Sequence, residues 1–457
     1  MQNKFINQMR GTINQIVEYQ NDNNTDPNKK RLIIVSGYVC EKGIGDYFMF
    51  IDMAALITKK FKHCFELFYV VYITNPAIIP KVNLQHYGIL LENLFIIYEE
   101  AEIERTERLC KLNPDLVIHT ACRPNRAVLA KYSHSKHIAC LEYEQAEYKV
   151  YKIGIDVNAN GIFFPVQSIK RELEIPWENS RLHRIADNNK FIFFAYFSNE
   201  HFLYDVVTFV RCALNSYITD PEKATADNPE SHAPIIFIIR FLQKRYINEW
   251  KKILSNQVVS LLGTNTDIQF VSIKNSDETI KKNTVYFITD AYPLVHSDMM
   301  KILNKCKNPV GITGNASFSE VVALEKIPYF EYSITKPMVA ASFFAFYNLY
   351  KIHFNYRCDF YDFLININAR QFILDLNSNE SSHSIMKKYN NEEYNNLITQ
   401  LDNFDKICSY VNLQKLYMNI RILYKYMFKE KNIENFIIDI VNKQFSLIDS
   451  DMIRTKL

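Results

Sequence analysis

Glycine is rare in this sequence, and its clusters indicate where the backbone could approach a ligand. The 457 residues contain ten glycines. Two pairs, Gly43 with Gly45 and Gly311 with Gly314, fall at or just after the end of an apolar run and before a helical pattern. In open α/β sheets, ligands bind outside the carboxyl ends of the strands, where helix N-termini offer free N–H groups to anions. Both pairs therefore mark candidate ligand sites.

The first pair presents a carboxylate, because Asp46 follows Gly45 directly. The motif begins like a dinucleotide fingerprint, but Phe48 occupies the place of the third glycine. The next apolar run ends with Asn75 following it instead of a ribose-binding acid, which disfavours a nicotinamide dehydrogenase. Asp46 either caps the helix that begins here or serves as a general base facing a cleft between domains.

The second pair precedes groups that suit a diphosphate. A strand ends at Thr313, and a glycine turn lets the backbone approach a phosphate. Ser317 and Ser319 then open a helix whose N–H groups and hydroxyls can hold a diphosphate. Glu320, expected in the first turn, can accept two hydrogen bonds from a ribose diol. Such a site would bind a nucleotide diphosphate without a metal.

The strands and helices that position these residues can be predicted from the sequence, because short apolar runs alternate with helical patterns. The runs are continuous, which is typical of strands buried on both faces, and the alternation predicts parallel sheets with crossover helices. In the first unit the predicted strands are 31–38, 66–74, 93–99, 115–120 and 137–143, with helices at 46–61, 101–112 and 125–132.

The same rhythm returns in a second unit, after a connection over 165–189 that we expect to be irregular. Its predicted strands are 191–198, 235–241, 267–273, 284–289, 310–313 and 327–332, with a polar loop at 219–234. Helical patterns follow to the end. The predicted divisions are therefore an N-terminal helix and polar linker (1–30), two α/β domains (31–185 and 186–336) and a helical C-terminal region (337–457).

Composition excludes several classes of protein. The formal net charge of +3 gives no reason to expect nucleic acid as a partner. Nine cysteines, odd in number and never spaced as C-x-x-C, suggest reduced thiols in a cytosol, with neither disulfides nor a zinc site. No apolar run is long enough to span a membrane, and the start lacks a Sec-type signal. We expect a cytoplasmic protein, while secretion by other routes stays open.

The stretch 284–331 resembles the donor-binding half of glycosyltransferases of the GT-B fold. In that family a Gly-rich turn, a Ser or Thr and a helix-start Glu precede a "G/K-x-P" strand, here Lys326-Ile327-Pro328. The layout is similar to inverting members such as the lipid II-forming GlcNAc transferases and the protein-arginine rhamnosyltransferases, and the latter also place an Asp in a Gly-Asp loop. The resemblance implies an α/β fold of two Rossmann-like domains facing a cleft, with a helical C-terminal region.

The resemblance also implies roles for individual residues. Gly314, Ser317 and Ser319 would contact the diphosphate, and Glu320 the ribose. The base would be recognised by the backbone around 292–295, and Asp46 would be the catalytic base. Asn315 stands where the family has a second glycine, and Ile312 stands where many retaining relatives have a second Glu. The remaining candidate donor contacts are Gly43, Gly45, Ser198, Asn199, Tyr292, Leu294 and Val295.

Each of two histidines and one turn has two possible roles. His296 begins a helix after a strand, either as a cap or surface residue or as a contact to the donor phosphate. His119, at the end of a strand of the first unit, is either a buried satisfied histidine or a second catalytic candidate. Ser198 and Asn199 either touch the pyrophosphate or form only a turn.

The expected function is an inverting, metal-independent glycosyltransferase that uses a nucleotide-diphosphate sugar as donor and needs no separate cofactor. Asp46, or else His119, would deprotonate the acceptor, which could be a protein, a glycan or a lipid. Two alternatives remain: a nucleotide-sugar epimerase or hydrolase, and a non-catalytic interaction protein that retains the fold.

Overall fold

The structure is a computed structural model that divides into two compact units. Unit 1 comprises Met1–Phe163 with Lys431–Leu457, and unit 2 comprises Phe164–Glu430. The residues that the structure describes are 30–39, 44–74, 84–98, 102, 106, 109–121, 126–141, 150–152, 160–197, 203–225, 228–240, 247–273, 280–288, 290–292, 294–313, 315–330, 408–430 and 432–456.

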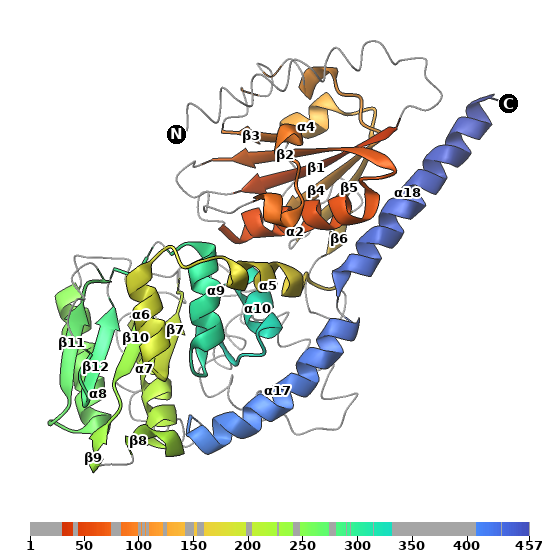
Figure 1. Ribbon diagram of the computed structural model, residues 1–457. Helices are drawn as coiled ribbons and strands as arrows, with labels where there is room; N and C mark the ends of the chain where they lie inside the picture. The colour runs from red at the N-terminus through yellow and green to blue at the C-terminus, as the bar shows by residue number, and fades with distance from the viewer. Residues whose placement is uncertain are drawn as a thin grey trace, which may run out of the picture. The chain divides into compact units, whose positions relative to one another are not determined.

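Unit 1 is built on a six-stranded parallel sheet in the order β3-β2-β1-β4-β5-β6 (Figure 1). Its strands are β1 (Arg31–Val39), β2 (Phe65–Ile73), β3 (Leu94–Ile97), β4 (Leu116–Ala121), β5 (Lys136–Leu141) and β6 (Val150–Lys152). Its crossover helices include α2 (Ile44–Phe61) and α4 (Arg126–Lys131), with 3-10 turns at Leu84–Tyr87, Leu91–Asn93 and Leu109–Lys111. The five strands predicted for this unit are confirmed, and the short β6 was not predicted.

Helices cover both faces of this sheet, which is why its strands are apolar throughout. Leu32 and Ile34 of β1 belong to a buried cluster that also contains Val128 of α4. On the opposite face α2 runs along the sheet, as Figure 1 shows, and the Phe50 ring lies where a Cβ on Gly37 would stand, 2.6 Å away. A side chain at position 37 would therefore force α2 away from β1.

Unit 2 has a second six-stranded parallel sheet, in the order β11-β12-β10-β7-β13-β14. The strands are β7 (Phe191–Ala195), β10 (Ile235–Ile239), β11 (Asp267–Val271), β12 (Thr284–Ile288), β13 (Val310–Ile312) and β14 (Pro328–Phe330). The helices between and beside them are α7 (Leu203–Ile218), α8 (Ile247–Leu262), α9 (His296–Lys305) and α10 (Asn315–Ala323). All six predicted strands are confirmed, and each unit is a Rossmann-like α/β arrangement.

Two stretches of unit 2 differ from expectation. The connection predicted to be irregular contains two helices, α5 (Val166–Glu174) and α6 (Ser180–Asn188). Each is short and buries only two or three side chains, and the Asn179 side chain caps α6 by accepting from the N–H groups of Arg181 and Leu182. The polar loop contains a 3-10 turn (Pro221–Lys223) and a small antiparallel hairpin of β8 (Ala224–Thr225) and β9 (Asn228–His232).

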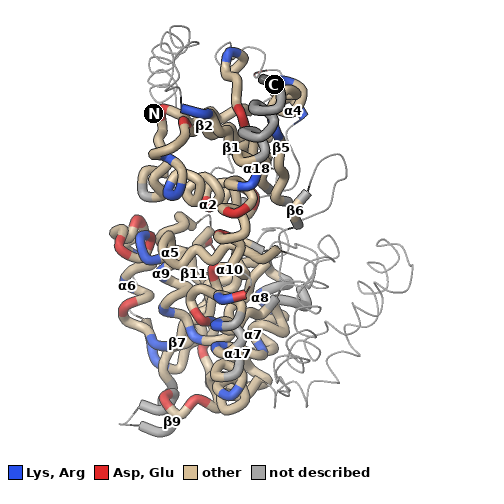
Figure 2. The backbone as a smooth tube through the Cα atoms, turned by 90° about the vertical axis from the view of Figure 1, so that its right-hand side faces the viewer, with Lys and Arg blue, Asp and Glu red and all other residues tan. Residues whose placement is uncertain are grey.

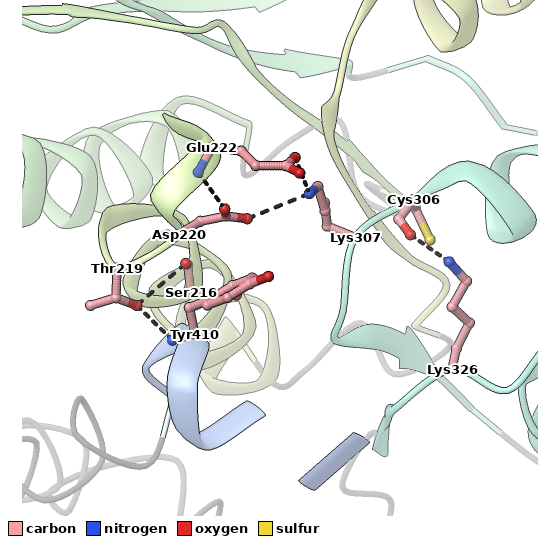
Figure 3. A network of polar contacts seen from close by, with 8 residues as sticks. All are labelled: Ser216, Thr219, Asp220, Glu222, Cys306, Lys307, Lys326 and Tyr410. Carbon is pink, nitrogen blue, oxygen red and sulfur yellow. Dashed lines mark hydrogen bonds and ion pairs between the residues drawn. The ribbon is translucent and has the colours of Figure 1, made fainter. Parts of the chain in front are cut away.

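A polar network joins segments of unit 2 that precede strands (Figure 3). Lys307, just before β13, pairs with Asp220 at 3.4 Å and with Glu222 at 3.3 Å. Lys326, just before β14, donates to the carbonyl of Cys306 at 2.7 Å. Lys307 also lies over the ring of Phe191, the first residue of β7. These contacts fix the amino edge of the sheet, the edge opposite the one where parallel sheets bind ligands.

The described part of the predicted helical region consists of two helices. In unit 2, α17 (Tyr410–Glu430) is bonded to the segment before β14, because the Tyr424 hydroxyl donates to the carbonyl of Lys326 at 2.7 Å. In unit 1, α18 (Ile433–Lys456) starts with the N–H of Ile433 bonded to the carbonyl of Ile162, and Phe445 packs on Phe65. Residues 1–29 and 331–407 lie outside the described residues, as does half of the helix predicted at 101–112.

Candidate functional site

The strand order of unit 2 places its topological switch point at β7. The chain proceeds from β7 to β10 on one side and returns to β13 on the other. Gly311 of β13 lies opposite Ala195 of β7, and a Cβ on Gly311 would meet the Ala195 Cβ at 2.5 Å. Gly311 is therefore needed for the close approach of two strands. Of the predicted glycine turn, Gly314 lies outside the described residues.

Helix α10 begins immediately beyond β13, at Asn315. The N–H groups of its first three residues, 315–317, have no carbonyl of the helix to bond, so they lie at the carboxyl edge of the sheet beside the switch point. Ser317 is half-buried, while Ser319 and Glu320 are 7% and 5% exposed. Because the helix starts earlier than expected, Glu320 lies in the second turn, and the prediction that it lies in the first turn is wrong.

Glu320 is paired with a histidine from another helix. Oε1 of Glu320 accepts from Nε2 of His296, the first residue of α9, at 2.8 Å. Nδ1 of His296 lies 3.8 Å from Oε1 of Glu172 in α5. Burial alone would lower the pKa of His296, but Glu320 and Glu172 raise it to about 9. The imidazole is therefore positively charged at neutral pH and lies between two carboxylates.

Another carboxylate, that of Asp298, fixes the first turn of α9. Asp298, 1% exposed, accepts from the backbone N–H groups of Glu178 and Asn179 at 3.1 and 2.9 Å. Lys301 lies 3.8 Å from Asp298 and over the ring of Trp177. Burial lowers the pKa of Lys301, although Asp298 opposes the shift. These contacts anchor the start of α9 to the connection between α5 and α6.

A cation at the same edge of the sheet was missed in the sequence. Arg240 follows β10, and its guanidinium donates to the Tyr196 hydroxyl at 2.9 Å while lying over the Tyr196 ring. The predicted base-binding residue Tyr292 packs on Tyr196 and donates to the carbonyl of Ala195 at 3.2 Å. The available signal was the single charge that directly follows the apolar run Ile235–Ile239. An arginine there can bind a phosphate.

The other predicted donor contacts are placed as follows. Leu294 and Val295 are half-buried, and the carbonyl of Val295 accepts from the N–H of Met299 in α9. The side chain of Asn315, with Gly43, Ser198 and Asn199, lies outside the described residues. The structure thus brings His296 and Glu320 into contact and places Ser317, Tyr292 and Val295 on segments that follow strands of the same parallel sheet.

The candidate catalytic residues of unit 1 lie in different surroundings. Gly45 and Asp46 occupy the first turn of α2, where Gly45 is exposed and Asp46 is 9% exposed. A carboxylate in a first helical turn is stabilised by the helix dipole. The prediction that Asp46 lies at a helix start is confirmed, and α2 is the next described element after β1.

His119 in β4 is fully buried at 0% exposure. His137 donates from Nε2 to the carbonyl of Tyr132 at 2.6 Å, so its Nδ1 accepts from Nε2 of His119 at 2.9 Å. Burial, and secondly His137, lower the pKa of His119 to about 3. Nδ1 of His119 and Oγ of Ser36, which is its register partner on β1, have no hydrogen-bond partner within the described part of the chain. His119 is therefore a neutral histidine inside the sheet's core.

Among the residues that the structure describes, no group of three or more His, Cys, Asp or Glu side chains could hold a metal ion. None of the described helices is long and apolar enough to cross a membrane. In the view of Figure 2 the acidic and basic residues are interspersed along both units.

No protein-family model matches the sequence, and no curated protein matches it either. Solved structures with some likeness include a putative UDP-N-acetylglucosamine 2-epimerase from Listeria monocytogenes (11% identity, TM-score 0.35, covering 66% of this chain and 78% of that one). A second is the UDP-GlcNAc 2-epimerase from Neisseria meningitidis bound to UDP-GlcNAc (12% identity, TM-score 0.34, covering 66% of this chain and 82% of that one). A third is an alpha-glucosyltransferase in complex with UDP and a 13-mer DNA containing a HMU base (8% identity, TM-score 0.37, covering 92% of this chain and 100% of that one). At TM-scores of 0.34 to 0.37 these likenesses are too distant to assign an activity.

Proposed function

We propose that this protein is a glycosyltransferase that moves a sugar from a nucleotide-diphosphate sugar to an acceptor, by direct displacement and without a metal. One observation carries the proposal. The start of α10 follows β13 at the switch point of unit 2, so free backbone N–H groups and Ser317 lie in the first turn, with Glu320 in the next. This combination of anion donors and a nearby carboxylate suits a nucleotide diphosphate, whose phosphates need donors and whose ribose needs an acceptor.

The donor half of the reaction needs positive potential where the leaving group develops charge. In the proposed mechanism the N-terminus of α10 and the hydroxyl of Ser317 donate to the diphosphate as the bond to the sugar breaks. Arg240 supplies a fixed positive charge after β10, which lies on the other side of β7 from β13. Glu320 accepts from the ribose hydroxyls, and the backbone around Tyr292 and Val295 contacts the base.

The acceptor half needs a base, and Asp46 is the residue we propose. Asp46 is slightly exposed in the first turn of α2, whereas His119 is entirely buried. A pKa near 3 also makes the His119 imidazole a weak base at neutral pH. In this mechanism Asp46 takes the proton of the acceptor group while that group attacks the sugar, and the nucleotide diphosphate departs.

Glu320→Ala tests the donor site. A ligand at about 100 times its dissociation constant stabilises a protein by about 2.7 kcal/mol, so a bound donor raises the melting temperature by several degrees. In a thermal-shift panel of UDP-, GDP- and dTDP-sugars, at least one is expected to stabilise the wild type and to lose this effect with Glu320→Ala. Glu325→Ala, which removes a carboxylate paired with Arg421 on the surface, is the matched control and should retain the shift.

The outcome of the panel also bears on the alternatives. If no nucleotide sugar shifts the wild-type melting temperature, a non-catalytic role is favoured and the proposal fails. If a sugar nucleotide binds, product analysis separates the reactions. An epimerase converts the sugar nucleotide without a second substrate, a hydrolase releases free sugar, and a transferase needs the acceptor.

A further inference from the structure

The imidazole of His296 lies between two carboxylates that come from different helices. All three side chains are at most 7% exposed. Glu320 from α10 is 2.8 Å from Nε2, and Glu172 from α5 is 3.8 Å from Nδ1. Both ring nitrogens therefore face carboxylates, so neither is directed at a phosphate. The sequence interpretation of His296 as a possible phosphate contact has no support in this geometry.

We propose that His296 is a positioning residue, oriented by Glu172, that holds Glu320 in one rotamer, so that unit 2 selects ribonucleoside over deoxyribonucleoside diphosphates. This role rests on the nucleotide-binding function proposed above. It names the substrate class of that site and adds Glu172 to it.

The hydrogen-bonding capacity of Glu320 permits this role. An ionised carboxylate has about four acceptor positions, and the bond from His296 occupies one of them. The others suit the paired 2′- and 3′-hydroxyls of a ribose, which both donate. A 2′-deoxyribose offers one hydroxyl fewer, so the buried carboxylate would lose a bond that water does not readily replace.

The charges around His296 explain why its loss should affect Glu320. Glu320 on α10 and Glu172 on α5 are the described charges that act on His296, and Asp298 and Lys301 form an ion pair further along α9. Asp298 is already satisfied by two backbone N–H groups, and Lys301 lies beside Asp298 and Trp177. Without the imidazolium, Glu320 would lose the charged donor that orients it, while Lys301, whose charge also acts on Glu172, lies beside Asp298. A Glu320 side chain that can change rotamer would position its oxygens less well for two ribose hydroxyls.

The experiment compares UDP with 2′-deoxy-UDP, and GDP with 2′-deoxy-GDP, by calorimetric titration. Wild type is expected to bind the ribonucleotide at least about tenfold more tightly, as hydrogen bonds to a charged group allow. In His296→Gln and Glu320→Gln this preference should fall to near unity through weaker ribonucleotide binding, and in Glu172→Gln it should fall in part. His183→Gln, which changes an exposed histidine of the same unit paired with Asp187, is the matched control and should keep the preference.

A pH profile distinguishes positioning from a merely structural role. The pKa of His296 is raised to about 9 by Glu320 and Glu172 against the effect of burial. Ribonucleotide preference should therefore be constant near neutral pH and decline as the pH rises through about 9. Glu172→Gln removes one of the charges that raise this pKa, so the decline should move to lower pH. Nitrogen NMR of the histidine ring, which needs no ligand, should show the same displacement in Glu172→Gln and Glu320→Gln.

The results separate this inference from the function on which it rests. If wild type binds neither UDP nor GDP, nor any sugar nucleotide of the panel, the proposed function fails, and the ribose selection fails with it. If wild type binds and prefers the ribonucleotide while His296→Gln, folded by its melting curve, keeps that preference, only the inference is overturned. A wild type that prefers a deoxynucleotide such as dTDP, or a His296 titration unaffected by Glu320→Gln, also overturns it.

Discussion

Two buried histidines in this protein have opposite protonation states, and their neighbours explain why. His296 is surrounded by carboxylates, which more than offset burial and raise its pKa to about 9. His119 has another imidazole as its hydrogen-bond partner, so nothing offsets burial and its pKa falls to about 3. The sequence revealed neither state, because Glu172 and His137 lie far from their partners along the chain. A single residue's type thus predicts its chemistry only once its spatial neighbours are known.

Asp46→Asn should separate binding from catalysis. The amide keeps the shape of the side chain but cannot take a proton, so donor binding should persist while transfer falls by about 10² to 10⁴-fold, the usual contribution of a general base. Initial-rate assays with calorimetric donor titration measure both quantities. Asp52→Asn, which changes a half-buried carboxylate on the same helix, is the control. Retained transfer by Asp46→Asn would remove this residue from the mechanism.

His119 should make unit 1 sensitive to acid. The folded-state pKa of about 3 lies below the ordinary value of 6.5, so the unfolded chain binds a proton that the folded chain rejects. Its contribution to stability is complete above pH 6.5 and is lost as the pH falls from 6.5 towards 3. Urea unfolding at pH 7 and pH 5, followed by hydrogen exchange in β4, measures the loss. His119→Gln, which can still donate to His137, should reduce it, and an unchanged pH slope would contradict the assignment.

At the scale of elements, the buried apolar strands were predictable, while the short strands β6, β8 and β9 and two helices were not. Strands such as β7 and β10 are continuous apolar runs because both faces of a parallel sheet are covered, and this signal is strong in a single sequence. Helices α5 and α6 have nine residues each and are polar on average, so they resembled a loop even though their few apolar residues follow helical spacing. The position of Glu320 was missed for another reason: the two serines suggested a late helix start, while the helix begins at Asn315.

Gly311→Ala should destabilise unit 2 through the contact between β7 and β13. The new Cβ would stand 2.5 Å from the Ala195 Cβ and 2.7 Å from the Phe197 ring, so the strands must separate, at a cost of about 1–3 kcal/mol. Thermal unfolding monitored in unit 2 measures the effect. Adding Ala195→Gly removes the nearest atom and should restore part of the stability in a double-mutant cycle. Simple additivity of the two changes would exclude the steric explanation.

At the scale of the whole molecule, unit 1 is assembled from both ends of the chain. Helix α18 buries Ile433, Ile437 and Val441, each at 0% exposure. Its Phe445 ring lies 4.3 Å from that of Phe65 at the start of β2, and Arg31 lies over it. The sequence indicated that this segment is helical, but no local pattern states which unit an amphipathic helix packs against. That information is carried by long-range contacts.

Truncation after Glu430 should therefore weaken unit 1 and leave unit 2 intact. Removing α18 exposes apolar surface on unit 1, and each buried side chain lost costs about 1.5–3 kcal/mol. Calorimetry with hydrogen exchange should show β1 and β2 losing protection while β7 and β10 keep theirs. A synthetic peptide of residues 431–457 added in trans should restore the protection of β1 and β2. Unchanged protection of these strands would refute the packing of α18.

The path of the chain through α18 also bears on how the protein is made. A ribosome synthesises β1 before unit 2 and α18 after it. The surface of unit 1 that α18 covers is therefore exposed until the whole of unit 2 has been translated. Chaperones that bind exposed apolar segments would have a long interval in which to engage it. A stop codon within the segment that encodes α18 would then destabilise unit 1, although the strands of that unit had already been synthesised.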